Sequence, residues 1–213
     1  MSRPTPAHPI LSIAARTILS LCAGILCVVG LSSCSLPEQQ SDLARYNKAI
    51  TKLDSSGSTE DHWYALSAAA KDSFEQGHYD DARKYAKELE KLTPQFRGNW
   101  NYGNAIQDYN LVLGRLALRD KDIRSAEDHL LKAGRSPGSP QMDSFGPNMS
   151  LAKDLLEAGQ RQVVLEYFEM VRKFWAPHPK TDELDRMHDQ ELSQWAAEVK
   201  AGKIPDFGAN LIY

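Results

Sequence analysis

The sequence predicts an all-α protein: a short α-solenoid of antiparallel helical hairpins, closed by a C-terminal capping helix. The first observation behind this prediction is a repeat, in which small and apolar residues recur at the same offsets around Ala82, Ala126 and Val164. The second is that sustained apolar–polar alternation, the pattern of a half-buried strand, is nearly absent. The third is that Gly and Pro gather in short runs between helical patterns.

The first 33 residues have the composition of an export signal. They contain no Asp or Glu, and Arg3 and Arg16 supply positive charge ahead of an apolar run from Ile18 to Leu31. That run of about 14 residues is shorter than the ~20 that a membrane-spanning helix needs. We therefore expect residues 1–33 to be a signal peptide.

The segment Leu31-Ser32-Ser33-Cys34 resembles the lipobox of bacterial lipoproteins. The resemblance implies cleavage before Cys34 and acylation of that cysteine, including palmitate, so that the mature chain is anchored to a membrane. By resemblance to the sorting rule of Gram-negative lipoproteins, Ser35 after the cysteine favours the periplasmic face of the outer membrane.

Two other interpretations of this region remain open. An apolar stretch counted back to Ile10 would serve as an uncleaved signal anchor, and Cys34 would be an ordinary thiol after a signal of the soluble type. Cys22 and Cys27 lie inside the apolar run, so cleavage leaves Cys34 as the last cysteine. A lone thiol in an oxidising compartment is a liability unless it is modified, which favours acylation.

Residues 34–40 are expected to be the lipidated cysteine and a polar tether, followed by a helical domain over 41–213. The first helix of that domain follows from the apolar positions Leu43, Tyr46, Ile50 and Leu53, which are three or four residues apart.

Three helical hairpins are expected, at about 61–94, 99–135 and 147–175. Small residues 12 positions before each anchor let the second helix of a hairpin cross the first closely, and bulkier residues four and seven positions after it fill the groove. The small residues are Ala70, Gly114 and Ala152, and Gly77, Lys121 and Gly159 mark the tight turns.

The stretch from Gly77 to Pro94 resembles the tetratricopeptide repeat, with Gly77, Tyr79, Ala82 and Pro94 at the family's positions. The resemblance implies that the first helices of the hairpins line a concave groove. The anchors are 44 and 38 residues apart, against about 34 in the family. The extra residues fall at 95–104 and at 136–147.

Two features depart further from the family. The segment 136–147 is too rich in Pro and Gly for us to expect a helix. The positions that form a carboxylate-binding clamp in some relatives are here Ser67, Lys71, Val112 and Ser150, so no such clamp is expected.

A capping helix is expected at about 182–201, with Thr181 as its N-cap. Its apolar face is formed by Leu184, Leu192, Trp195 and Val199. Gly202 and Pro205 end it, and we expect the tail with Phe207, Leu211, Ile212 and Tyr213 to pack back on the body.

The sequence offers no catalytic signature and no pair of histidines at metal-ligand spacing, so we expect a non-enzymatic protein with no cofactor and no metal. The whole chain has a net charge of −3, and without Arg3 and Arg16 it is more acidic. Nucleic-acid binding requires clustered Lys and Arg, so nucleic acid is not an expected partner.

Surface recognition is the leading hypothesis: a membrane-tethered adaptor or scaffold that binds a protein or peptide in the bacterial cell envelope. Amides and tyrosine hydroxyls on the first helix of the second hairpin suit the backbone of an extended peptide. The candidate partner-binding residues are Asn101, Tyr102, Asn104, Asp108, Tyr109 and Arg115, together with Arg135 and Phe145 at the ends of the Pro-rich segment.

Three alternatives stay open. In the first, Trp100 and Tyr102 only pack the insertion at 95–104 against the helical body and bind no partner. An envelope hydrolase or small-ligand-binding protein would use the insertions around 95–110 and 136–147 as a deep pocket lined by Asn101, Asn104, Asp108, Arg135 and Phe145. A purely structural homo-oligomer is the third.

Overall fold

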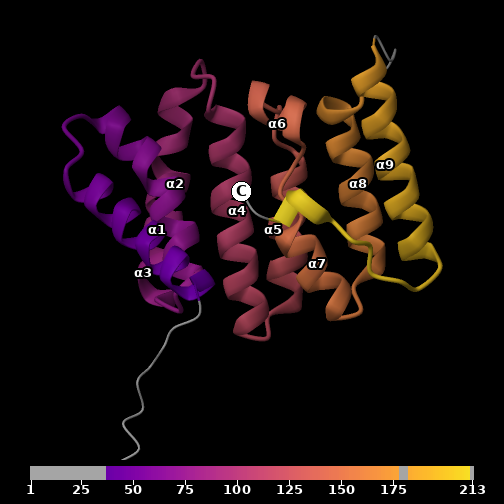
Figure 1. Ribbon diagram of the computed structural model, residues 1–213, viewed down its shortest axis with the longest axis horizontal. Coiled ribbons are helices and arrows are strands. Elements are labelled where there is room, and N and C mark those ends of the chain that lie inside the picture. The colour runs from indigo at the N-terminus through magenta and orange to yellow at the C-terminus, as the bar shows by residue number, and fades with distance from the viewer. Residues whose placement is uncertain (1–36, 178–181, 212–213) are drawn as a thin grey trace, which may run out of the picture. The chain divides into compact units, whose positions relative to one another are not determined.

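The computed structural model describes residues 37–177 and 182–211, and these residues belong to one compact unit (Figure 1). They form nine α-helices and two short 3-10 helices, with no strand among them, so the all-α prediction is confirmed. The helices are α1 (Pro37–Asp54), α2 (Thr59–Glu75), α3 (Tyr79–Leu92), η1 (Thr93–Phe96), α4 (Tyr102–Arg119), α5 (Ile123–Gly134), α6 (Pro140–Phe145), α7 (Ser150–Glu157), α8 (Arg161–Trp175), α9 (Glu183–Lys200) and η2 (Gly208–Leu211). The expected signal peptide, Cys34, Thr181, Ile212 and Tyr213 lie outside the described residues.

Helix α1 begins at Pro37, so the tether expected over residues 34–40 is in part helical. Its apolar side packs on α2, where Leu53 is buried, whereas Leu43 is 49% exposed. Ser58 then caps α2, because its side-chain oxygen accepts a hydrogen bond from the backbone N–H of Asp61.

The three expected hairpins correspond to the pairs α2–α3, α4–α5 and α7–α8, whose members pack against each other. The anchors Ala82, Ala126 and Val164 are fully buried. The turns fall where the sequence indicates them. Lys121 has a φ of 65°, a left-handed conformation that is unusual for a residue with a side chain.

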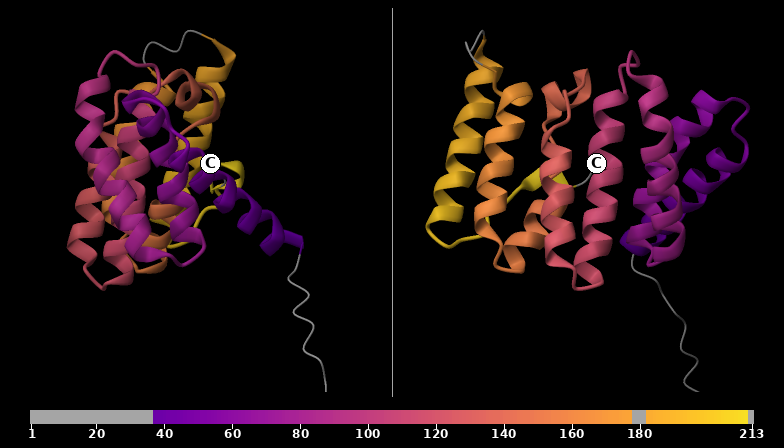
Figure 2. Two further views of the ribbon diagram at one scale, coloured as in Figure 1. Left: turned by 90° about the vertical axis from the view of Figure 1, so that its left-hand side faces the viewer. Right: turned by 180° about the vertical axis from the view of Figure 1, so that it is seen from behind.

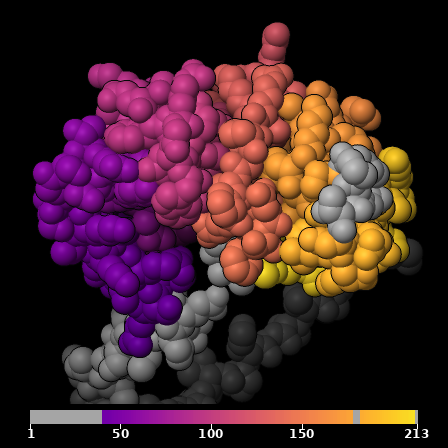
Figure 3. Space-filling view, turned by 90° about the horizontal axis from the view of Figure 1, so that it is seen from above, coloured from indigo at the N-terminus to yellow at the C-terminus, as the bar shows by residue number. Residues whose placement is uncertain are grey.

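Successive pairs adjoin one another in chain order, as the views in Figures 2 and 3 show. Helix α3 packs on α4, α5 packs on α7 and α8, and α8 packs on α9. The first helices are also neighbours, since α2 contacts α4 and α4 contacts α7. Gly114 allows the second of these contacts, because a Cβ there would lie 2.3 Å from Leu151 Cδ2.

The Pro- and Gly-rich segment at 136–147 contains a short helix, so the expectation that it would not be helical was wrong. Pro140 occupies the first turn of α6, where its missing N–H costs nothing. Ser139 caps the same turn by accepting a hydrogen bond from the Met142 N–H at 3.0 Å. Local capping is sufficient here because only six residues have to be ordered.

Helix α9 is capped by Asp182 and not by Thr181, since the Asp182 carboxylate accepts a hydrogen bond from the Asp185 N–H at 2.9 Å. Leu192, Trp195 and Val199 of the expected apolar face are buried against α8, whereas Leu184 is 44% exposed.

The C-terminal tail packs back on the body as expected. Phe207 is buried, and the Met149 N–H donates to the carbonyl oxygen of Asn210 at 2.7 Å. Asn210 also donates from its amide to the Pro147 carbonyl oxygen at 3.0 Å. These bonds hold the tail against the segment that joins α6 to α7.

Within residues 37–177 and 182–211, no helix combines the length and the apolar character needed to traverse a lipid bilayer.

Candidate binding groove

Two adjoining cavities lie along the side of the molecule formed by α2, α4 and α7, and both open to solvent. The first, of about 380 Å³, is the amide cavity, lined mainly by Tyr64, Ser67, Trp100, Asn101, Asn104, Asp108 and Gln141. The second, of about 560 Å³, is the charged cavity, lined mainly by Arg45, Asp72, Glu75, Val112, Arg115, Ser150, Lys153 and Asp154. Ala68 and Lys71 of α2 line both, so the two cavities are neighbours, and together we call them the groove.

The amide cavity takes its name from a hydrogen-bonded set of carboxamides at its floor. Asn104 is buried and donates both amide hydrogens, one to Asn101 Oδ1 at 2.8 Å and one to Gln141 Oε1 at 3.0 Å. Its own oxygen accepts from the Ser139 hydroxyl at 2.6 Å. The set joins α4 to α6 and fixes the orientation of three side chains, although Gln141 follows Asn104 by 37 residues and Asn101 by 40.

A close backbone contact brings α6 to this position. A Cβ on Gly103 would lie 1.9 Å from the Gly138 carbonyl oxygen, a distance that no side chain tolerates. The Ser136 hydroxyl reinforces the contact by donating to the Gly103 carbonyl oxygen at 2.8 Å. The first turn of α4 and the segment before α6 therefore touch through their backbones.

Two aromatic rings form the rim of the amide cavity. Trp100 is 58% exposed, and its ring lies 6.1 Å from that of Tyr64 at an angle of 29°. The Tyr64 hydroxyl is held by Asn99, which in turn donates to Glu60 at 2.7 Å. An exposed indole beside ordered polar groups provides an apolar surface for a ligand, next to side chains that can form hydrogen bonds.

Ion pairs connect the helices around the charged cavity. Arg115 of α4 bridges to Glu75 of α2 at 2.5 Å and to Asp154 of α7 at 2.7 Å, and its guanidinium lies 4.4 Å from the centre of the Phe74 ring. Burial opposes the charge on Arg115, but the two carboxylates outweigh it and raise the pKa of Arg115 above its ordinary value. The cation is therefore held firmly between its partners.

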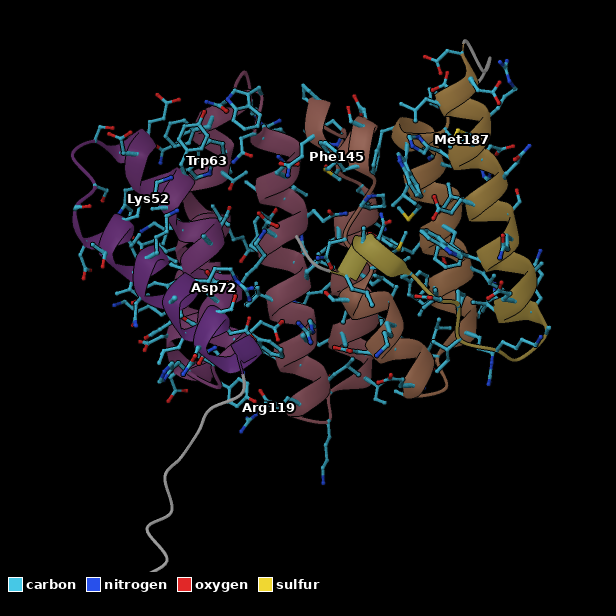
Figure 4. All side chains as sticks on the ribbon, in the orientation of Figure 1. Lys52, Trp63, Asp72, Arg119, Phe145 and Met187 are labelled. Atoms are coloured by element: carbon cyan, nitrogen blue, oxygen red, sulfur yellow. The ribbon has the colours of Figure 1, made fainter. Side chains whose placement is uncertain are left out.

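Two more pairs extend this pattern. Lys71 of α2 pairs with Asp108 of α4 at 2.9 Å, and Arg45 of α1 pairs with Asp72 of α2 at 3.1 Å. Lys52 of α1 and Asp72 of α2 mark this side of the molecule in Figure 4. Neighbouring helices along the groove are thus cross-linked by opposite charges.

The structure brings some of the predicted partner-binding residues together and separates others. Asn101, Asn104 and Asp108 line the amide cavity, and Arg115 lines the charged one. Tyr109 packs instead against the apolar residues between α3 and α4, and burial raises its pKa. Tyr102, Arg135 and Phe145 line neither cavity. Phe145 is 66% exposed on α6 (Figure 4).

The proposed deep pocket of the hydrolase alternative required Arg135 and Phe145 beside the three α4 residues, and the structure does not place them there. The positions expected to face the groove, Ser67, Lys71, Val112 and Ser150, all line one or both cavities. Sequence reasoning missed Gln141 and Tyr64. The available signal for Gln141 was Ser139 followed by Pro140, because an N-cap residue before a proline marks the first turn of a helix.

One hydrogen-bonded set resembles a catalytic triad but lies outside both cavities. Ser56 Oγ lies 3.0 Å from His62 Nδ1, and His62 Nε2 lies 2.9 Å from Glu88 Oε1. The Ser56 hydroxyl has a second possible acceptor in the Leu53 carbonyl oxygen, at 2.7 Å. None of Ser56, His62 and Glu88 lines either cavity, so the set is not placed to act on a ligand bound in the groove. Among the described residues no group of His, Cys, Asp and Glu has the geometry of a metal site.

The chain matches no protein-family model, and neither curated proteins nor solved structures include a significant match to it.

Proposed function

We propose that this chain is a bacterial lipoprotein that acts as a non-enzymatic adaptor in the cell envelope. Acylated Cys34 tethers it to a membrane, at the periplasmic face of the outer membrane. Its body is a tetratricopeptide-like α-solenoid, and the groove along α2, α4 and α7 binds an extended segment of a protein or peptide partner.

The order of helix contacts supports a solenoid. Each helix pair packs on the next one in the chain, and the final helix α9 covers the last pair. The ion pairs add a regular element, because Lys71–Asp108, Arg115–Glu75 and Arg115–Asp154 join successive first helices at sequence separations of 37, 40 and 39 residues. Similar separations are what a repeating unit of this size produces.

The observation that carries the adaptor proposal is that the two open cavities adjoin along α2 and α4 and share Ala68 and Lys71 as lining residues. A groove that runs across three helices accommodates an extended chain better than a compact metabolite, which is normally enclosed on most sides. The groove contains polar side chains for a peptide backbone and an exposed aromatic rim for an anchoring side chain. The lipid anchor rests on the sequence from Arg3 to Cys34.

Position-specific photo-crosslinking on the full-length chain in its native membranes tests this proposal. A photoreactive amino acid at Ala68, which lines both cavities, or at Ser150 in the charged cavity should give one recurring crosslinked partner. The matched control is the same amino acid at Lys87, an exposed residue on α3 that lines neither cavity. We expect adducts from the groove positions and none from position 87.

Equal crosslinking from all three positions, or none from any, would overturn the adaptor proposal. An adduct that contains two copies of this chain would replace it with the homo-oligomer.

A further inference from the structure

The hydrogen bonds at the floor of the amide cavity determine which polar atoms remain free. Ser139 Oγ already accepts the Met142 N–H as the cap of α6, so its own proton is directed to Asn104 Oδ1 at 2.6 Å. That bond fixes the orientation of the Asn104 amide. Asn104 must then donate to the oxygens of Asn101 and Gln141.

The free groups of the cavity are therefore mostly donors. Asn101 and Gln141 accept through their oxygens in this network, and their amide nitrogens donate no hydrogen bond to a described residue. Both carboxylates that line the cavity already accept from a neighbour, Asp108 from Lys71 and Asp61 from Ser58.

The charges that line the cavity cancel. Lys52 and Lys71 are balanced by Asp61 and Asp108, so the cavity selects neither an anion nor a cation. Its rim, in contrast, offers the exposed indole of Trp100 and the ring of Tyr64. A suitable ligand is uncharged, rich in hydrogen-bond acceptors, and has flat apolar surfaces.

We propose that the amide cavity binds a proline-rich segment of the partner in the polyproline II conformation. Proline has no N–H, and a polyproline II helix makes no internal hydrogen bonds, so its carbonyl oxygens are free acceptors that need donors. Proline rings pack on aromatic side chains, as in other grooves that recognise such segments. Carbonyls meet the Asn101 and Gln141 donors, and a ring packs on Trp100. This inference rests on the proposed peptide-binding function and names the chemistry of its ligand.

A neutral sugar is the other ligand that suits an exposed indole beside amides. Its hydroxyl groups both donate and accept, so it is best satisfied by a mixture of free donors and free acceptors. The excess of free donors in this cavity favours the proline-rich chain.

The test is fluorescence anisotropy with the full-length lipoprotein in detergent micelles. The probes are a labelled peptide containing six consecutive prolines, a peptide of equal length made of Gly and Ser, and the labelled trimer of N-acetylglucosamine. We expect saturable binding of the proline peptide only, with little dependence on salt, because no net charge attracts it.

Three variants locate the site. Trp100→Ala should weaken binding of the proline peptide roughly tenfold, as removal of an aromatic anchor typically does. Gln141→Glu keeps the oxygen that Asn104 donates to and replaces the free donor by an acceptor, so it should also weaken binding. Phe145→Ala removes another exposed aromatic ring outside the cavity and should leave binding unchanged. Circular dichroism checks that each variant keeps its helix content.

Binding of the sugar trimer in place of the proline peptide would overturn the inference, as would equal binding of the Gly-Ser peptide. Absence of binding by all three probes would also overturn it. If the crosslinks from Ala68 and Ser150 still form in that case, the adaptor proposal stands and only the proline-rich ligand is lost. If those crosslinks fail as well, both proposals fail.

Discussion

The backbone of Gly138 lies so close to Gly103 that a Cβ at position 103 would approach the Gly138 carbonyl oxygen to 1.9 Å. Because Ser139 and Gln141 follow directly, this single contact determines whether the amides of α4 and α6 meet. It links the stability of the α6 segment to the shape of the amide cavity.

Gly103→Ala tests that contact. Alanine normally stabilises a helix relative to glycine by up to about 1 kcal/mol, but here its Cβ meets backbone that cannot move without displacing α6. We expect a net loss of roughly 1–3 kcal/mol in the free energy of unfolding, the range for overpacked sites. Chemical denaturation measures it.

Gly98→Ala is the matched control, because a Cβ there meets no atom within 4 Å. It should leave stability nearly unchanged. If both variants behave alike, the Gly103–Gly138 contact does not position α6.

Arg115 should be the most important charged residue of the groove for stability. Its side chain is only 21% exposed and binds two carboxylates from two other helices. Arg115→Ala leaves both acids without this partner and should cost roughly 2 kcal/mol, as the loss of charged hydrogen bonds at partly buried sites does. Thermal and denaturant unfolding report the loss.

The comparison for Arg115 is Arg186→Ala. Arg186 pairs with Glu183 on the surface of α9, where both side chains are more than half exposed. Such pairs contribute between 0 and about 1 kcal/mol. A smaller effect from Arg115 than from Arg186 would contradict the bridging role.

His129 should make stability depend on pH. Burial, with a smaller contribution from Lys132, lowers the pKa of His129, whose ring bonds Asn110 Oδ1 at 2.9 Å. The unfolded chain protonates first, near its ordinary pKa of about 6.5. The stabilisation of the folded state by neutral His129 is complete above that pH. It decreases as the pH falls toward the lower pKa of His129 in the folded state.

Denaturant unfolding of the wild type and of His129→Gln isolates this contribution. Both proteins are measured at steps of about one pH unit from roughly pH 8 down to roughly pH 5. Glutamine retains a donor toward Asn110 and does not titrate. The wild type should lose more stability than the variant on acidification. Parallel curves would rule out a contribution from His129.

Cys34→Ala tests the predicted anchor. Acyl chains contribute about 0.8 kcal/mol for each buried CH₂ group, so removing the acylated side chain should release the protein from the membrane. The wild type should incorporate radiolabelled palmitate and sediment with membranes, whereas the variant should do neither. A variant that stays with the membrane without palmitate would favour the uncleaved signal anchor.

Much of the fold follows from local pattern. The recurrence around Ala82, Ala126 and Val164 predicted three helix pairs and their turns, because a buried helix face needs small and bulky residues at steps of three and four. The errors have local causes. Ser139 and Pro140 outweighed the Gly content of their neighbourhood and formed α6, and Asp182 capped α9 in place of Thr181.

The candidate site was only partly predictable. Asn101, Asn104 and Asp108 line the amide cavity, because the first helices lie side by side, and their binding of a partner stays a prediction. Tyr109 was predicted to line the groove, but it packs between α3 and α4. The prediction failed because helical periodicity does not show which side of α4 each neighbouring helix covers. Gln141 could not be paired with Asn104 from sequence separation alone.

By itself the sequence determined the all-α class, the three helix pairs and the turns between them, because these depend on side-chain spacing along a few consecutive turns. Only the tertiary structure decided which polar atoms remain free in the groove. That depends on a backbone contact between two glycines 35 residues apart, and on the direction in which one serine hydroxyl points once its oxygen has capped a helix.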